Sequence, residues 1–161
     1  MVVFGTRPEA TKLAPVIKIL QENSDFNTIV VTSGQHREQL KQVLDCFNIC
    51  TDYDLNIMKE KQDLIYITTS VLTGLNEVVK KVQPDLLVVH GDTQTALSAS
   101  LISVMKKIPL IHIEAGLRTF DKYNPWPEEI NRTIIDSISD LCLAPTEINK
   151  ENLMQSGINQ N

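Results

Sequence analysis

The apolar positions of this chain follow two different spacings. Short, continuous apolar runs occupy residues 2–5, 28–33, 86–90, 110–114 and 141–144. Between them, apolar residues recur every three or four positions, as expected for helices with one buried face. Continuous apolar runs are typical of parallel strands that are covered on both sides. The repeated strand–helix order therefore predicts an α/β fold with a doubly wound parallel sheet.

These patterns give approximate limits for each element. We expect strands at residues 2–5, 28–33, 52–56, 86–90, 110–114 and 141–144. We expect helices at residues 8–21, 36–47, 63–82, 93–107, 127–139 and 146–156. Pro15 falls inside the first helix and is expected to kink it. No internal repeat, low-complexity tract or linker interrupts the series, so residues 1–161 are expected to form one domain.

Charged and polar residues cluster just after the strands. In a doubly wound sheet, ligands bind beyond the carboxyl ends of the strands, so this edge of the sheet is expected to carry the site. The residues that follow the strands in this way are Arg7, Glu9, Lys12, Gln35, His36, Arg37, His90, Asp92, Glu114, Arg118, Glu128 and Glu129. Their expected convergence is the strongest functional signal that the residues give without any comparison.

The turn after the first strand reads "GTRPEATK" and lacks the glycine-rich pattern common at this position. Arg7 and Lys12 could hold a phosphate or diphosphate, because arginine offers a planar fork, lysine a point charge, and the helix amino terminus a favourable dipole. The alternative is that both are solvated charges on the first turns of a helix.

Three carboxylates are candidates for a functional role, and two of them, Asp92 and Glu128, could instead have a structural role at the start of a helix. Asp92 stands between a strand and a helix, where aspartate is also a good N-cap. Glu114 ends a strand at the ligand edge, which favours a functional role. Glu128 follows Pro127 at a helix start, where Glu128 and Glu129 would also complement the helix dipole.

Composition and charge narrow the possible partners and location. The net charge of −5 is mild, so neither nucleic acid nor a membrane is indicated as a partner. No apolar run is long enough to span a bilayer, and the amino-terminal run is too short for a signal peptide. We therefore expect a cytoplasmic protein.

The cysteines and histidines give no metal-binding pattern. The three cysteines, Cys46, Cys50 and Cys142, are expected to be free thiols that are mostly buried. His36 and His90 lack the spacing of a metal-ligand pair, so hydrogen bonding is the favoured role for each. Inside an apolar strand, His112 is expected to be a core histidine.

Six motifs together point to a known family. In order along the chain they are "FGTRPEATKLAP", "SGQHREQL", "YDLNIM", "VHGDTQTAL", "HIEAGLRTFD" and "NPWPEEINRTIID". In this combination the chain closely resembles the non-hydrolysing UDP-N-acetylglucosamine 2-epimerase family over nearly its whole length. The resemblance implies a two-domain fold of the glycosyltransferase-B type, of which residues 1–161 would be the amino-terminal Rossmann-like half. The chain ends soon after Gly157, where a further strand and a UDP-binding second domain would be expected.

The resemblance also implies an activity. Members of this family interconvert UDP-N-acetylglucosamine and UDP-N-acetylmannosamine by eliminating UDP and adding it back, which needs no metal or nicotinamide cofactor. The implied partners are UDP-N-acetylglucosamine, UDP and, for the full-length protein, a second copy of itself. The usual destination of the product is a cell-surface polysaccharide.

Family roles transfer only to matching positions. The resemblance implies acid/base roles for Asp92, Glu114 and Glu128, and substrate binding by Arg7, Lys12 and His90. A possible second site, at which the substrate activates the enzyme, matches Gln35, Glu38, Lys61 and Gln62. Family members often carry Gln and Arg where this chain has Glu38 and Lys61. The family's uridine-diphosphate contacts and a catalytic histidine belong to the second half.

Two other functions remain open at this point. The chain could belong to a hydrolysing relative, which releases free N-acetylmannosamine and UDP. It could also be a non-catalytic, truncated Rossmann-like module that binds a partner or ligand weakly. An assay for free sugar separates the two enzymes, and activity of the chain in isolation would argue against the module.

Overall fold

The computed structural model describes residues 1–34 and 37–158, with the side chains of residues 37–39 outside that description. The strands are β1 (Val2–Phe4), β2 (Val30–Thr32), β3 (Tyr53–Asp54), β4 (Leu87–His90), β5 (Leu110–Ile113) and β6 (Leu141–Leu143). The helices are α1 (Arg7–Glu22), α2 (Arg37–Cys46), α3 (Leu64–Val82), α4 (Gln94–Lys106), α5 (Glu128–Ile138) and α6 (Glu147–Gln155).

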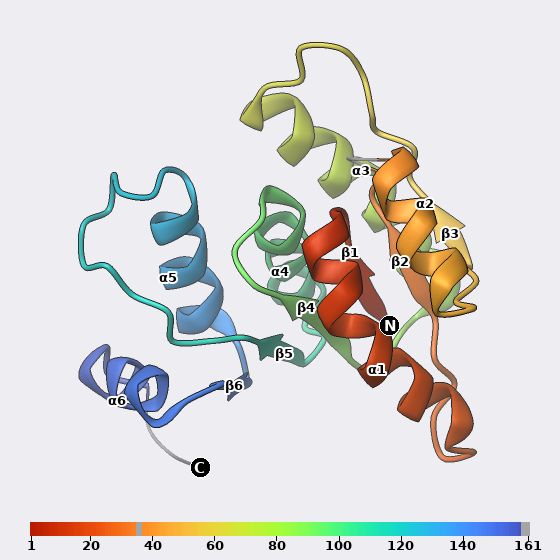
Figure 1. Ribbon diagram of the computed structural model, residues 1–161. Coiled ribbons are helices and arrows are strands. Elements are labelled where there is room, and N and C mark those ends of the chain that lie inside the picture. Colours follow the sequence, from red (N-terminus) through yellow and green to blue (C-terminus); the bar gives the residue numbers. More distant parts are fainter. Residues whose placement is uncertain (35–36, 159–161) are drawn as a thin grey trace.

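The strands form a parallel sheet in the order β3-β2-β1-β4-β5-β6. The chain therefore starts in the middle of the sheet, winds outward to β3, and returns to build the other half from β4 (Figure 1). Strands β1 and β4 meet where the winding reverses, with Val2 opposite Val88. This arrangement confirms the predicted doubly wound, Rossmann-like α/β fold.

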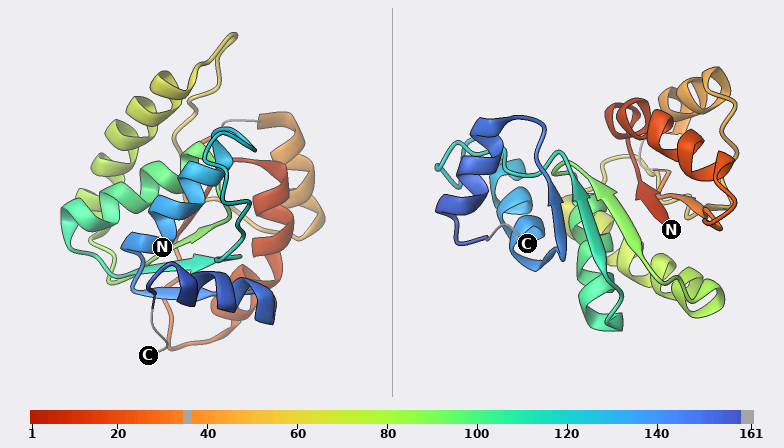
Figure 2. Two further views of the ribbon diagram at one scale, coloured as in Figure 1. Left: turned by 90° about the vertical axis from the view of Figure 1, so that its left-hand side faces the viewer. Right: turned by 90° about the horizontal axis from the view of Figure 1, so that it is seen from below.

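Alternating strand residues build two hydrophobic cores, one on each face of the sheet. Val3 and Val31 belong to the core covered by α3, α4 and α5, whereas Val2 and Val30 belong to the core beneath α1 and α2. Figure 2 shows the first two helices on one side of the sheet and α3 and α4 on the other. Each of these strands is thus covered on both sides, which explains its continuous apolar run.

Every predicted strand and helix is present, with ends that differ by a few residues. The largest differences are at the second strand, predicted over residues 28–33 and observed at Val30–Thr32, and at the third, predicted over residues 52–56 and observed at Tyr53–Asp54. Pro15 lies inside α1, as predicted from its position. Pro127 is the N-cap of α5 rather than its first residue.

The prediction that the cysteines are mostly buried is wrong. Cys46 and Cys50 are exposed, and Cys142 is half-buried. Cys46 is the last residue of α2, and Cys50 follows in the turn that leads to the edge strand β3, so neither reaches a core. All three are free thiols, as predicted.

Two further findings concern membranes and His112. Within residues 1–34 and 37–158, no helix combines the length and apolar character needed to cross a membrane. The His112 side chain is fully buried, which confirms it as a core histidine.

Candidate active site

Three turns that are far apart in the sequence meet at the carboxyl edge of the sheet. His90 ends β4 opposite Ile113 of β5, and Glu114 follows at once. The Oε2 atom of Glu114 lies 3.5 Å from Nε2 of His90, and its Oε1 atom pairs with Nζ of Lys12 from α1. The structure thus brings together three of the residues that the sequence assigned to one edge.

Asp92 is not the N-cap of α4. That role belongs to Thr93, whose hydroxyl accepts a hydrogen bond from the Ala96 amide at 3.0 Å. The Oδ2 atom of Asp92 instead lies 2.5 Å from Nη2 of Arg132, and the Asn131 side chain donates to the Asp92 carbonyl at 2.9 Å. The structural alternative for Asp92 is therefore removed, and α5 holds this residue from two sides.

Neighbouring charges perturb Asp92. Burial raises the pKa of its carboxyl group above the ordinary value, while Arg132 acts to lower that pKa. The negative charges of Glu128 and Glu114 raise the pKa of Asp92 further, so both lie within electrostatic reach of it. A carboxyl group with a raised pKa beside two other carboxylates is suited to acid/base chemistry.

Arg132 ties Asp92 to the loop before α5. Its Nη1 atom lies 3.5 Å from Oε2 of the buried Glu129, which also accepts hydrogen bonds from the amides of Thr119 and Phe120. Glu129 is thus a structural residue that fixes the loop. Our sequence reasoning missed Arg132, although its spacing of three from Glu129 places both on one face of a helix.

Glu9, in the first turn of helix α1, has a structural role. Glu9 is buried, forms a capping box with Thr6, and accepts hydrogen bonds from the Gly5 and Thr6 amides at 3.1 and 2.8 Å. The Thr93 hydroxyl donates to its other oxygen at 2.9 Å. Burial raises the pKa of Glu9. Glu9 therefore joins the starts of α1 and α4 instead of facing a ligand.

Arg7 and Lys12 are the outward-facing charges in the first two turns of α1. Both are exposed, and within the described part of the chain no ion pair engages Arg7. Arg7 is the first residue of α1, where backbone amides and the helix dipole also favour an anion. This end of α1 is therefore suited to attract an anion, and its Lys12 contacts one of the three carboxylates, Glu114.

His90 is almost fully buried beside Glu114. Burial lowers the pKa of its imidazole to about 4; the Glu114 charge opposes this shift, and Lys12 and His112 add to it. His90 is thus neutral at pH 7, and its role in hydrogen bonding stays a prediction. Among the described residues, no group of three or more His, Cys, Asp and Glu side chains could hold a metal ion.

A buried polar chain lies behind the β4 turn. The Nε2 atom of His112 lies 2.7 Å from the Gly91 carbonyl, and its Nδ1 atom lies 2.5 Å from Oδ1 of Asp136. Arg118 pairs with the other oxygen of Asp136 at 2.7 Å. Asp136 was missed in the sequence, where the only available signal was a histidine inside an apolar strand, since a buried ring nitrogen needs a polar partner.

The proposed activator residues are described only in part. Gln35 lies outside the described residues, as does the side chain of Glu38, whose backbone belongs to α2. Lys61 and Gln62 lie in the loop between β3 and α3, and Lys61 is exposed. The site that these four residues would form stays a prediction.

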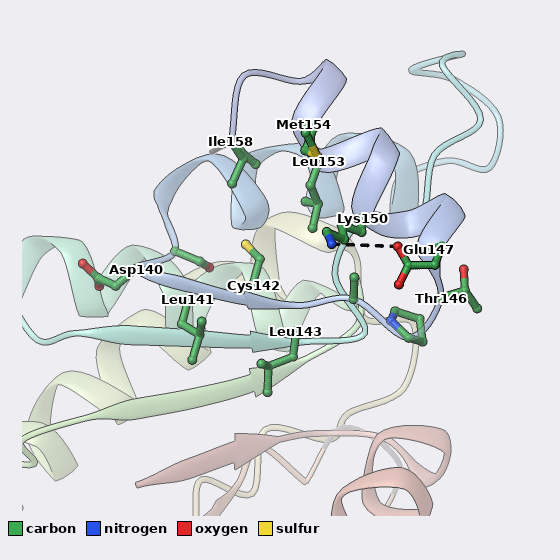
Figure 3. Close-up of a pocket in the computed structure, with 13 residues that line it drawn as sticks. Asp140, Leu141, Cys142, Leu143, Thr146, Glu147, Lys150, Leu153, Met154 and Ile158 are labelled. Atoms are coloured by element: carbon green, nitrogen blue, oxygen red, sulfur yellow. Dashed lines mark ion pairs between the residues drawn. The ribbon is translucent and has the colours of Figure 1, made fainter. Parts of the chain in front are cut away.

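A pocket beside the edge strand β6 is distinct from this charged edge. It lies between β6 and α6, where Leu153 points toward the strand, and the ion pair of Lys150 and Glu147 at 3.8 Å lies on its wall (Figure 3). None of the residues predicted for catalysis or substrate binding lines this pocket. The carboxyl edge of the sheet therefore remains the candidate active site.

Known proteins share this sequence and fold. A UDP-N-acetylglucosamine 2-epimerase of Neisseria meningitidis serogroup A is 51% identical over 158 residues, which cover 98% of this chain and 42% of that protein. The crystal structure of the Neisseria meningitidis enzyme bound to UDP-GlcNAc matches with a TM-score of 0.95 and 51% identity, covering 98% of this chain and 43% of that one. The Methanocaldococcus jannaschii enzyme, solved with UDP-GlcNAc and UDP, matches with a TM-score of 0.92 and 38% identity, covering 98% and 43%.

The extent of the match decides the family. The chain spans about two fifths of the length of the curated relatives it matches. A family model described as UDP-N-acetylglucosamine 2-epimerase matches residues 18–161, which is most of the chain and includes the carboxylates, His90 and Arg132. On this evidence the chain belongs to the UDP-N-acetylglucosamine 2-epimerase family.

Proposed function

We propose that this chain forms the amino-terminal half of a non-hydrolysing UDP-N-acetylglucosamine 2-epimerase, which interconverts UDP-N-acetylglucosamine and UDP-N-acetylmannosamine. One observation carries the proposal: Asp92 and Glu114 come together with Lys12 and His90 at the carboxyl edge, and Glu128 lies within electrostatic reach. Family membership supplies the substrate class, because relatives have been solved with UDP-GlcNAc and with UDP.

The chemistry requires both kinds of charge found at this edge. The hydrogen on C2 of the sugar is not adjacent to a carbonyl group, so its direct removal is very unfavourable. Elimination breaks the bond between C1 and the diphosphate oxygen, removes the C2 proton, and leaves 2-acetamidoglucal and UDP. Addition of UDP to C1, with return of a proton to the other face of C2, gives the epimer. The site must therefore bind a departing anion and move a proton on two faces.

Each cation has a role in holding that anion. Arg7 and Lys12 bind the diphosphate, which gains negative charge as the bond to C1 breaks. In the free protein Lys12 pairs with Glu114, and its side chain remains half exposed, so an arriving diphosphate can take over this cation. Release of Glu114 from that pair would then couple substrate binding to the readiness of a carboxylate.

The carboxylates supply the proton transfers. Asp92, Glu114 and Glu128 are the acid/base groups, since they come from two strand ends and one helix start and can approach a sugar from different sides. His90 is neutral at pH 7 and hydrogen-bonds the substrate without adding charge. Each acid/base group is expected to contribute roughly 10²–10⁴-fold to the rate.

The remaining features of the proposal concern the whole protein. A second, carboxy-terminal domain of a glycosyltransferase-B-type fold would bind the uridine diphosphate and close the cleft, and two copies would form a homodimer in the cytoplasm. Gln35, Glu38, Lys61 and Gln62 would form a substrate-activated second site. Closure between domains excludes water and completes a catalytic set, so residues 1–161 alone are expected to be inactive.

The decisive experiment runs the full-length enzyme in deuterated water. We expect deuterium at C2 in both sugar nucleotides, because the removed proton exchanges with solvent before it returns, and we expect no accumulation of free N-acetylmannosamine. Complete retention of protium at C2 would contradict elimination. Free N-acetylmannosamine with stoichiometric UDP would instead identify the hydrolysing enzyme.

A further inference from the structure

We propose that His112 is a doubly protonated positioning residue, which clamps the Gly91 carbonyl and thereby fixes the turn that carries His90 and Asp92. This inference rests on the proposed function for its kinetic consequence, while the state of the His112 ring can be measured independently of any activity.

The protonation of His112 follows from its two partners. The Gly91 carbonyl can only accept, so the Nε2 atom, 2.7 Å away, must carry a hydrogen. The Nδ1 atom faces Oδ1 of Asp136 at 2.5 Å. If Asp136 is ionised it too can only accept, and Nδ1 must then carry a hydrogen as well.

Asp136 is surrounded by donors, which keeps it ionised. Its Oδ2 atom receives Arg118 at 2.7 Å and the Gly116 amide at 3.1 Å, and the Cys142 thiol points at its carbonyl and at Oδ1. Burial alone would raise the pKa of Asp136, but the hydrogen bond from His112 and the charges of His112 and Arg118 lower it. The Cys142 thiol stays neutral, because burial raises its pKa to about 12.

The titratable and charged groups around His112 come from four neighbouring segments. Asp136 belongs to α5, Arg118 to the loop after β5, Cys142 to β6, and His90 to β4, where His112 lowers its pKa. The pair of His112 and Asp136 is fully buried, with Arg118 nearly so, and an unpaired charge at such a depth would be costly. The three charges therefore depend on one another and form a rigid unit.

The clamp acts on a turn that has little freedom to relax elsewhere. Gly91 has a φ of 66° and lies between His90 and Asp92, and its amide donates to the Ile113 carbonyl at 2.9 Å. Two residues of β5, His112 and Ile113, thus hold the carbonyl and the amide of Gly91. A shift of this turn would move Asp92 away from a sugar carbon, and misplacement by about 1 Å can cost on the order of 10²-fold in rate.

The first test measures the ring directly in this chain. With ¹⁵N-labelled histidine, both ring nitrogens of His112 are expected to give the signals of protonated nitrogens at pH 7, because each of them faces a hydrogen-bond acceptor. In Asp136→Asn the amide can donate to Nδ1, so the signal is expected to change to a neutral ring that keeps its hydrogen on Nε2. A neutral ring in the unaltered chain at pH 7 would overturn the proposal.

The second test measures turnover in the full-length enzyme. His112→Gln is expected to lower kcat by about 10²-fold with little change in KM, because the substrate contacts remain. Asp136→Asn should retain more activity, since the neutral ring still clamps Gly91. An unchanged kcat in His112→Gln, with the protein folded, would also overturn the proposal.

Asp140→Asn is the matched control. Asp140 accepts a hydrogen bond from the Leu110 amide at 2.8 Å, so it is a carboxylate that anchors the other end of the same strand. Its replacement should lower stability without lowering kcat, and equal kcat losses in Asp140→Asn and His112→Gln would refute a positioning role. An inactive wild-type enzyme with an imidazolium signal from His112 would refute the proposed function while leaving the ring assignment intact.

Discussion

The two sides of the candidate site are built in opposite ways. The anchored side comprises His90, Gly91 and Asp92, and it is held in place by a buried hydrogen bond from β5 and by partly buried contacts from α5. The open side comprises Arg7 and Lys12 on α1, whose side chains are exposed and make one ion pair within the described residues, from Lys12 to Glu114. In the proposed reaction, a proton is moved at one fixed carbon atom, whereas a diphosphate leaves and returns. The difference indicates that rigidity is concentrated where the proposed reaction tolerates least displacement.

The largest effect is expected when the carboxylate of the anchored side, Asp92, is neutralised. Asp92→Asn in the full-length enzyme is expected to lower kcat by about 10²–10⁴-fold, because an amide cannot transfer the proton. Thermal unfolding should change far less than kcat, since Thr93 and not Asp92 caps α4, and the asparagine oxygen can still accept a hydrogen bond from Arg132. Steady-state kinetics and melting curves measure both quantities.

Asp63→Asn is the control for that substitution. Asp63 is a true N-cap, accepting a hydrogen bond from the Tyr66 amide at 2.7 Å, and asparagine caps helices equally well. Its activity and stability should both stay near those of the wild type. Similar rates for Asp92→Asn and Asp63→Asn would show that Asp92 has no catalytic role.

A smaller effect is expected when the anchor is removed and the carboxylate stays. Arg132→Gln should lower kcat/KM by up to about 10²-fold through misplacement of Asp92. Because Arg132 lowers the pKa of Asp92, its loss raises that pKa, and the limb of the pH–rate profile that reports Asp92 should move to higher pH.

Lys150→Gln serves as the control for Arg132→Gln. It also removes a cation from a helical pair with a spacing of three, but that pair is exposed, with Glu147 at 3.8 Å. Exposed pairs of this kind contribute about 0–1 kcal/mol, so neither the pH profile nor the melting temperature should move appreciably. An Arg132→Gln profile that superimposes on the wild-type profile would contradict the anchoring of Asp92.

The smallest effect should come from a conservative change on the open side. Arg7→Lys keeps the charge but loses the planar fork, so we expect a loss in kcat/KM on the order of tenfold or less. Thermal unfolding should be unchanged, because Arg7 is exposed and has no ion pair in the described part of the chain. Arg7→Gln, which removes the charge, should cost distinctly more, and equal losses for the two variants would argue against an electrostatic role.

The sequence predicted the elements well because strand burial and helical spacing are local signals. The continuous runs around Val88 and Ile111 follow from cover on both faces, and a run of that kind needs no knowledge of its neighbours. The same reasoning placed Lys12, His90, Asp92 and Glu114 at one edge, because parallel strands end on the same side. The roles assigned to them from the family resemblance stay predictions.

The supporting residues could not be predicted in the same way. Which carboxylate faces a ligand and which is buried depends on contacts between distant segments, as with Glu9 and Thr93, which are 84 positions apart. Glu9 and Glu129 looked like ligand-edge charges, yet both fix backbone amides. The contact of Arg132 with Asp92 spans 40 residues and that of Asp136 with His112 spans 24, so neither contact could be read from a local pattern.

The pairing of Lys12 with Glu114 has a consequence for the order of folding. The two residues are 102 positions apart, and they can meet only after β1 has paired with β4 and β4 with β5. Contacts of this sequence separation form slowly, because a long loop must be closed before they contribute any stability. During synthesis, a nascent chain that has not reached β5 thus carries the cations of α1 without their carboxylate partner. Catalytic geometry would then appear late, in the same step that completes the middle of the sheet.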